Sequence, residues 1–178
     1  MQAYVEGDVR AFRRLFESLA PALYAFFARS LRNATVADDL TQTTFLKLHR
    51  SRRQWRRGGR LRPWVFSIAA HVRTDWLRSH GRLAAEALDD ERLAASQPSS
   101  DPCAESGDRE RSERVRAALE SLPESQRIVV HLHRFEGLGF ADIGKILGIS
   151  EGAAKLRAFR AYEELRKRLG DLASKESP

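Results

Sequence analysis

Lys155, Arg157 and Arg160 are three cationic side chains within a short, helix-like stretch near the end of the sequence. Lysine and arginine donate hydrogen bonds to DNA phosphates, and both can also address the acceptor atoms on a guanine edge in the major groove. These residue types therefore suit contact with duplex DNA, provided that a rigid element presents them outward.

The segment from Phe140 to Leu165 supplies such an element. Its first apolar residues recur at helical spacing: Phe140, Ile143 and Leu147. Gly144 is small enough for a crossing helix to approach, Gly148 permits a tight turn, and Ser150 can cap the next helix. The pattern predicts a helix-turn-helix whose second helix carries the cations. Taken alone, the segment fits an ordinary helical hairpin in a core equally well.

A second cationic segment, RSRRQWRRGGRLR, spans residues 50–62 and holds seven arginines. So many like charges repel one another unless a polyanion neutralises them, and Gly58 and Gly59 disfavour a helix. A basic loop that also contains Trp55 suits single-stranded or distorted nucleic acid, because guanidinium groups hold phosphates and flat rings stack on bases. A solvated basic loop without a ligand is the alternative.

Apolar residues at intervals of three and four predict helices on both sides of this loop. The first region contains two apolar stripes that Pro21 separates or kinks: Phe12, Leu15, Phe16 and Leu19, then Leu23, Phe26, Phe27 and Leu31. Thr35 and Asp38 resemble a capping box at the start of a helix that runs to about Arg50. Its expected inward face is Val36, Leu40, Phe45 and Leu48. Pro63 begins another helix, whose expected core-facing residues are Val65, Ile68, Ala69, Val72 and Trp76.

Charge is distributed unevenly along the 178 residues, whose formal net charge is +7. Residues 1–80 carry +9, residues 81–111 carry −4 and residues 112–178 carry +2. The middle segment contains AASQPSSDPCAESGD, which has little to bury and predicts a flexible acidic linker. Strand patterns are nearly absent and there is no internal repeat. We therefore expect an all-α fold with two small helical domains, 1–80 and 112–170, the linker 81–111 between them, and a tail at 171–178; the second domain is the helix-turn-helix.

Several classes of function are disfavoured. No apolar run reaches the roughly 20 residues of a membrane span, and MQAYVEGDVR lacks the apolar core of a signal peptide, so we expect no membrane insertion and a cytoplasmic location. Cys103 is the single cysteine, which rules out an internal disulfide. The five histidines, His49, His71, His80, His131 and His133, lack metal-binding or catalytic partners at site spacing. With no phosphate loop and no Ser/His/Asp set, the sequence predicts no cofactor, no metal and no enzymatic activity.

Three segments in this order resemble bacterial RNA polymerase sigma factors of the extracytoplasmic-function (ECF) type, group IV of the sigma-70 family. They are ADDLTQTTFLKLHR (37–50), PWVFSIAAHVRTDWLR (63–78) and LPESQRIVVHLHRFEGLGFADIGKILGISEGAAKLRAFRAYEELR (122–166). The resemblance implies a specificity subunit that binds core RNA polymerase, reads the minus 10 and minus 35 promoter elements, directs transcription initiation and aids strand opening in the bacterial cytoplasm. The implied partners are the polymerase β′ clamp and β subunit, promoter DNA and an anti-sigma factor.

The resemblance also assigns roles to residues. Docking on core polymerase is implied for Asp38, Asp39, Leu40, Gln42 and Phe45, the last as support. Minus 10 recognition and melting are implied for Trp55, Arg56, Arg57, Arg60, Trp64, His71, Arg73 and Arg78. Minus 35 recognition is implied for Ser150, Glu151, Lys155, Leu156, Arg157, Phe159 and Arg160, where Phe159 either covers a thymine methyl group or packs inward.

The chain departs from the family pattern at several of these positions. Thr43 stands where an acid usually follows the glutamine, so the docking surface has one charge fewer. Ser67 replaces an arginine and His71 an asparagine on the helix that begins at Pro63, which changes its hydrogen-bonding groups.

A stand-alone helix-turn-helix regulator is the alternative from a different class. Its N-terminal half would serve dimerisation or sensing, and it would bind duplex DNA unaided and protect a palindrome. A sigma factor needs core polymerase and protects two separated elements. The arginine-rich, glycine-broken segment favours the sigma factor, because a dimerisation domain has no need of it.

Overall fold

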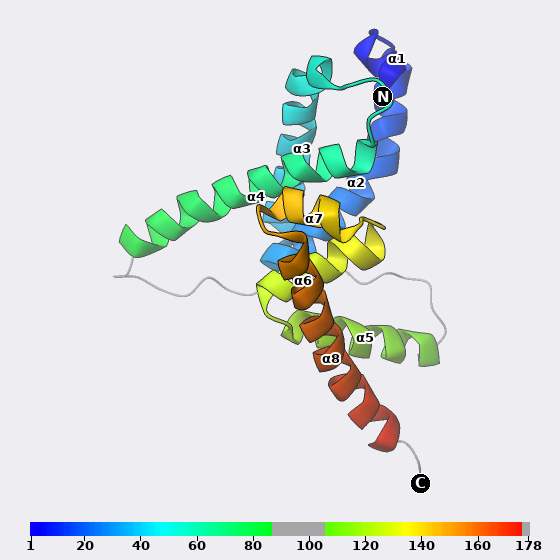
Figure 1. Cartoon of the computed structure of the whole chain (residues 1–178), viewed down its shortest axis with the longest axis vertical. Helices are drawn as coiled ribbons and strands as arrows, with labels where there is room; N and C mark the ends of the chain where they lie inside the picture. Colours follow the sequence, from blue (N-terminus) through cyan, green and yellow to red (C-terminus); the bar gives the residue numbers. More distant parts are fainter. Residues whose placement is uncertain (87–105, 176–178) are drawn as a thin grey trace. The chain divides into compact units, whose positions relative to one another are not determined.

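The structure is a computed structural model that describes residues 1–86 and 106–175, with the side chains of residues 1–80 and 111–170. Every regular element in these ranges is helical, which confirms the predicted all-α class. The chain forms two compact units, Met1–Gln97 and Pro98–Pro178, called here the N-terminal and C-terminal units (Figure 1).

The N-terminal unit contains four α-helices and a short 3-10 turn. They are α1 (Gln2–Val5), α2 (Val9–Leu31), α3 (Ala34–Ser51), η1 (Arg52–Gln54) and α4 (Leu61–Glu86). Figure 1 shows α2 and α3 side by side with α4 lying across them. Helix α3 is in contact with both α2 and α4. The arrangement places the acidic segment of α3 and the basic segment that follows it on one small scaffold.

Helix starts in this unit differ in detail from the sequence predictions. Asn33, not Thr35, caps α3: its backbone is extended and its side-chain oxygen accepts a hydrogen bond from the Val36 amide at 3.1 Å. Helix α4 begins at Leu61, two residues before Pro63. The proline is tolerated in the first turn because the amides of that turn have no partner within the helix.

Helix α2 passes through Pro21 without ending. The proline ring is exposed, so the backbone carbonyl that loses its amide partner there lies on the solvent side. Of the two roles expected of Pro21, separating the apolar stripes is wrong, because both stripes belong to one helix of 23 residues.

Aromatic residues form the centre of the N-terminal core. Phe26, Phe27 and Phe66 are fully buried, and the Phe26 ring meets Phe66 edge-on with centroids 5.6 Å apart. Of the predicted core-facing residues of α4, three are buried, namely Val65, Ala69 and Val72. Ile68 and Trp76 are only half-buried, and the sequence pattern missed Phe66.

The C-terminal unit contains α5 (Ser106–Ser121), α6 (Glu124–Val130), a π-helical turn η2 (His131–Phe135), α7 (Phe140–Leu147) and α8 (Glu151–Lys175). Helices α5, α6 and α7 all pack on α8. Leu122, Val130 and Ala161 form a buried cluster, against which Leu119 and Leu165 pack. The second helix of the helix-turn-helix is thus also the helix on which the rest of this unit is built.

Helices extend into both ends of the segment expected to be a linker. Residues 81–86 belong to α4 and residues 106–111 to α5. Leu83 is the one large apolar residue among these positions, but they include good helix formers, so helix propensity continues where the apolar pattern stops. Cys103 lies outside the described residues. None of the helices that the structure describes combines the length and apolarity needed to cross a membrane.

Candidate polymerase and nucleic-acid interfaces

The acidic segment of α3 has an exposed polar face with apolar support behind it. Asp38, Asp39 and Gln42 are exposed, whereas Leu40 and Phe45 are buried. The Phe45 ring lies 4.6 Å from that of Phe16 on α2 and edge-on to that of Phe12 at 6.2 Å (centroid distances). Leu40 and Phe45 therefore hold the face in place, and the two carboxylates and the amide form its surface.

Sequence reasoning missed Leu46 at the end of this face. Its side chain is 60% exposed, and it lies four residues after Gln42 and seven after Asp39. Residues at these intervals share one side of a helix. The available signal in the sequence was a leucine at helical spacing from the acids and outside the predicted inward face of the helix.

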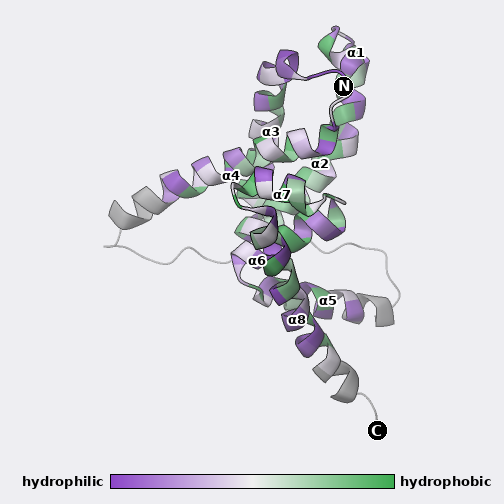
Figure 2. Ribbon diagram, in the orientation of Figure 1, coloured by the Kyte–Doolittle hydropathy of each residue, from purple (hydrophilic) through white to green (hydrophobic). Residues whose placement is uncertain are grey.

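The connection between α3 and α4 holds the predicted arginines on the surface. Arg56, Arg57 and Arg60 are exposed. In Figure 2 this connection is drawn mainly in the hydrophilic colour. Gly58 has a φ of 78°, a conformation that suits glycine, and the half-buried Trp55 packs on Trp64 with ring centroids 5.2 Å apart. The connection thus places an aromatic pair beside exposed guanidinium groups.

One of these arginines already has an acidic partner. The Arg57 guanidinium forms an ion pair with Glu6, which follows α1, at 3.0 Å. Both side chains are largely exposed, so the pair contributes little to stability and a phosphate can displace the carboxylate.

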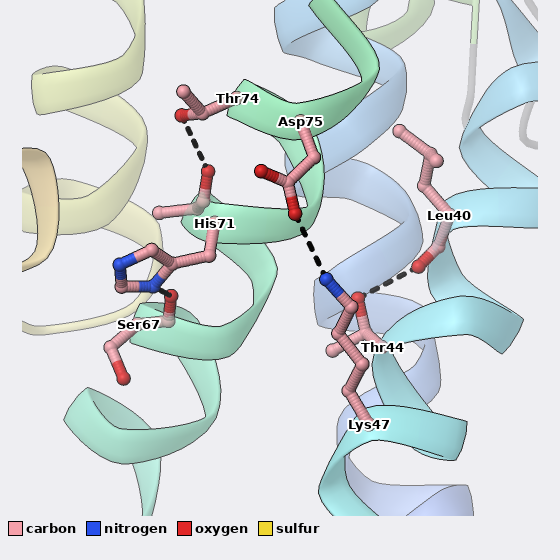
Figure 3. Close-up of polar contacts among 8 residues, drawn as sticks. Leu40, Thr44, Lys47, Ser67, His71, Thr74 and Asp75 are labelled. Atoms are coloured by element: carbon pink, nitrogen blue, oxygen red, sulfur yellow. Dashed lines mark hydrogen bonds and ion pairs between the residues drawn. The ribbon is translucent and has the colours of Figure 1, made fainter. Parts of the chain in front are cut away.

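Helix α4 contains the remaining residues that were predicted to contact the minus 10 element. Trp64 and Arg73 are half-buried, and His71 and Arg78 are exposed. The His71 Nδ1 atom lies 2.6 Å from the Ser67 carbonyl oxygen (Figure 3). Because a carbonyl only accepts, Nδ1 is the donor of this hydrogen bond, and Nε2 is the second polar atom of the ring.

An ion pair joins α3 to α4 next to this histidine. Lys47 Nζ on α3 donates to Asp75 Oδ2 on α4 at 3.0 Å, as Figure 3 shows. A shallow cavity of about 290 Å³ lies nearby, lined by Lys47, Arg50, Ser51, Ile68 and His71. No role was predicted for Lys47 from the sequence, and Arg50 was placed in the basic segment 50–62 without an individual role.

Because of the Lys47–Asp75 pair, the stability of the N-terminal unit changes with pH in the acid range. The hydrogen bond from Lys47, with its charge, lowers the pKa of Asp75 below the ordinary value of 3.8. The stabilisation is therefore present above pH 3.8 and is lost as the pH falls through the lowered pKa. We expect Asp75→Asn to cost the N-terminal unit less than about 1 kcal/mol at pH 7, because both side chains are exposed and screened. Urea unfolding of both proteins from pH 7 down through the acid range measures this, and a difference that does not shrink as the pH falls below 3.8 would contradict it.

The turn between α7 and α8 is built as predicted. Gly148 ends α7 with a φ of 65°, and the Ile149 amide donates to the Gly144 carbonyl at 2.9 Å. Ser150 Oγ accepts a hydrogen bond from the Ala153 amide at 3.1 Å, which confirms the predicted cap. A Cβ atom on Gly144 would lie 2.8 Å from the Ile149 carbonyl oxygen, so the turn requires a residue without a side chain at this position.

The first turns of α8 present a mixed cationic and apolar surface. Lys155, Leu156, Phe159 and Arg160 are exposed, and Arg157 is half-buried. Phe159 is 62% exposed, so it does not pack inward, which removes one of its two expected roles. Lys155 Nζ lies 2.6 Å from Glu151 Oε1 one turn earlier.

One histidine has a partner that sequence reasoning missed. His131 and Glu136 are both buried, with Nε2 and Oε1 3.3 Å apart. The Glu136 amide also donates to the His131 carbonyl at 3.3 Å, the spacing of the π-helical turn η2. The side chains described at 1–80 and 111–170 include no group of three or more His, Cys, Asp or Glu residues that could hold a metal ion.

Comparison with known proteins agrees with this geometry. Residues 15–83 match the model of sigma-70 region 2, and residues 112–165 match that of sigma-70 region 4. The chain is 39% identical to the RNA polymerase sigma factor CarQ of Myxococcus xanthus over 97% of each chain. It is 32% identical to the ECF sigma factor SigE of Mycolicibacterium smegmatis over 90% of this chain and 62% of that protein.

A solved structure shares the fold. The sigma factor RpoE of Bartonella quintana, in complex with the anti-sigma factor NepR, matches with a TM-score of 0.74 and 24% identity, over 91% of this chain and 98% of that one.

An all-α chain that combines sigma-70 regions 2 and 4 defines a DNA-binding factor of transcription initiation. The chain belongs to the sigma-70 family, as an ECF RNA polymerase sigma factor. It binds core RNA polymerase and directs promoter-specific transcription, and the stand-alone regulator is not favoured.

Proposed function

We propose that three surfaces divide the work of this sigma factor. The exposed face of α3, formed by Asp38, Asp39 and Gln42, docks on the β′ clamp of core polymerase. The observation that carries this assignment is that the acids are exposed while Leu40 and Phe45 on the same helix are buried. A rigid face of this kind presents its charges without a further ordering cost, which favours binding.

The α3–α4 connection and the adjoining part of α4 hold the opened minus 10 strand. Exposed Arg56, Arg57 and Arg60 suit its phosphates, and the Trp55–Trp64 pair offers rings on which an unpaired base can stack. Arg73 and Arg78 extend the cationic surface along α4, and His71 adds a hydrogen-bonding edge. This surface aids strand separation because it binds the single strand better than the duplex.

The first turns of α8 read the minus 35 element in the major groove. The exposed cations and Glu151 address phosphates and base edges, and the cap at Ser150 fixes the start of the helix. The residues assigned to this contact are Ser150, Glu151, Lys155, Leu156, Arg157, Phe159 and Arg160.

The protein itself performs no catalysis in this proposal, since core polymerase makes the RNA. It acts in the bacterial cytoplasm, where that polymerase works. An anti-sigma factor controls it, as supported by the similar fold of the Bartonella sigma factor that was solved with one. The domains for these roles are residues 1–80 and 112–170.

Reconstitution with bacterial core polymerase tests the docking assignment. The full chain is compared with the variant that carries both Asp38→Lys and Asp39→Lys. The measurements are the affinity for core polymerase and transcription from the DNA upstream of the protein's own gene. We expect the reversal to weaken core binding at least about 30-fold, because two favourable charge contacts become repulsive. Glu17→Lys, a reversal of an exposed acid on α2, is the matched control and should bind normally.

The outcomes separate the possibilities. A wild-type complex that tolerates the double reversal would place docking on another surface. A wild-type protein that ignores core polymerase yet protects a palindromic duplex alone would overturn the proposed function as a whole.

A further inference from the structure

Helix α8 exposes two large apolar side chains one turn apart. Leu156 is 48% exposed and Phe159 is 62% exposed. Residues three apart on a helix are neighbours, so the two side chains form one apolar surface, called here the Leu156–Phe159 pair. Contiguous exposed apolar surface marks contact sites more often than single exposed apolar residues do.

The surroundings of this pair indicate the chemistry of its partner. Exposed Lys155 and Arg160 flank it, and the carboxylate of Glu151 is paired with Lys155. The preceding turn contains Gly152 and Ala153, whose small side chains let the helix approach a partner closely. A partner that suits this surface is polyanionic at its edges and apolar in its middle, which describes duplex DNA entered through the major groove.

Among unmodified bases, the C5-methyl group of thymine is the apolar group that the major groove presents. Side chains three residues apart on a helix have Cβ atoms about 5–6 Å apart, and successive bases of one strand rise about 3.4 Å. The pair can therefore contact methyl groups on neighbouring base pairs at once.

We propose that the Leu156–Phe159 pair recognises thymine methyl groups within the upstream promoter element. This inference rests on the proposed function of α8 and adds the chemical group that it reads. The cations bind phosphates and guanine edges, while the apolar pair selects thymine over cytosine at the positions that it covers.

Replacing thymine with deoxyuridine removes only the methyl group and keeps every hydrogen bond of the base pair. We would form holoenzyme from the full chain and core polymerase, locate the upstream element by footprinting, and measure its affinity for that duplex with thymine or with uracil in the protected element. We expect about a fourfold loss of affinity for each contacted methyl group, as follows from the free energy of burying one methyl group.

Variants identify the side chains responsible. In Leu156→Ser and Phe159→Ser holoenzymes, affinity for the thymine duplex should fall toward that for the uracil duplex, so that sensitivity to uracil is reduced. Both side chains are exposed, so the substitutions leave the fold intact. Val115→Ser changes an exposed apolar residue of α5, outside helix α8, and should keep full sensitivity.

Equal affinity of wild-type holoenzyme for both duplexes would overturn the inference, as would full uracil sensitivity in both serine variants. The footprint and transcript would remain in either case, and the proposed function would stand. Absence of any footprint on the thymine duplex would overturn the proposed function, and the inference with it.

Discussion

Gly144→Val is expected to lower the free energy of unfolding of the C-terminal unit by at least about 3 kcal/mol. A Cβ atom at this position would lie 2.8 Å from the Ile149 carbonyl oxygen and 3.3 Å from the Glu151 amide nitrogen. Both are backbone atoms of the turn, which cannot move without losing the hydrogen bond from the Ile149 amide to Gly144. The two methyl groups of valine enlarge the overlap.

The distribution of tryptophan makes this effect measurable in the whole chain. All three tryptophans, Trp55, Trp64 and Trp76, lie in the N-terminal unit. For Gly144→Val, the urea transition followed by circular dichroism should begin at a lower urea concentration. The transition followed by tryptophan fluorescence should keep its midpoint. Gly152→Ala is the control: its new Cβ would meet only the Ser150 hydroxyl at 4.0 Å, and alanine should stabilise the helix by about 0.5–1 kcal/mol. An unchanged circular dichroism transition in Gly144→Val would show that the turn yields.

Arg127→Met is expected to cost the same unit about 2–4 kcal/mol. Arg127 on α6 is buried, and its Nη1 atom donates to the carbonyls of Glu120 at 3.1 Å and Leu122 at 2.9 Å. Helix α5 ends at Ser121, so this guanidinium joins the end of one helix to the next and opposes the negative end of its dipole. Methionine keeps an apolar stem but leaves both carbonyls without this donor.

Urea unfolding of the full chain by circular dichroism measures this loss. Arg134→Met, which removes an exposed arginine of the same unit, should change stability by no more than about 0.5 kcal/mol. Equal stability of the two variants would mean that other donors replace Arg127.

The sequence predicts best those parts of the protein that depend on local chemistry. Gly148 and Ser150 were assigned correctly, because a left-handed turn and a helix cap each depend on a few adjacent residues. Asp38 and Asp39 are exposed, in agreement with the inward face predicted for α3, which does not include them.

Features that depend on packing or on irregular backbone were missed. The His131–Glu136 pair needs the π-helical turn, whose spacing differs from the α-helical one assumed for the sequence. Phe66 was overlooked because its burial comes from Phe26 on α2, at a distance in sequence that no periodicity reports. Asn33 rather than Thr35 caps α3, because backbone angles decide which of two nearby polar residues caps a helix, and the sequence does not show those angles.

Contacts of the first seven residues bear on how the protein should be produced. Tyr4 packs on Phe12 and shares a hydrogen bond with His49 at the end of α3, and Glu6 holds Arg57. An acidic peptide attached next to α1 would therefore lie near the arginine-rich connection and compete with DNA for it. Trimming α1 as a dispensable extension would instead leave Arg57 without its carboxylate. Assays of DNA opening should accordingly use protein that keeps α1 and Glu6 and carries no acidic tag next to them.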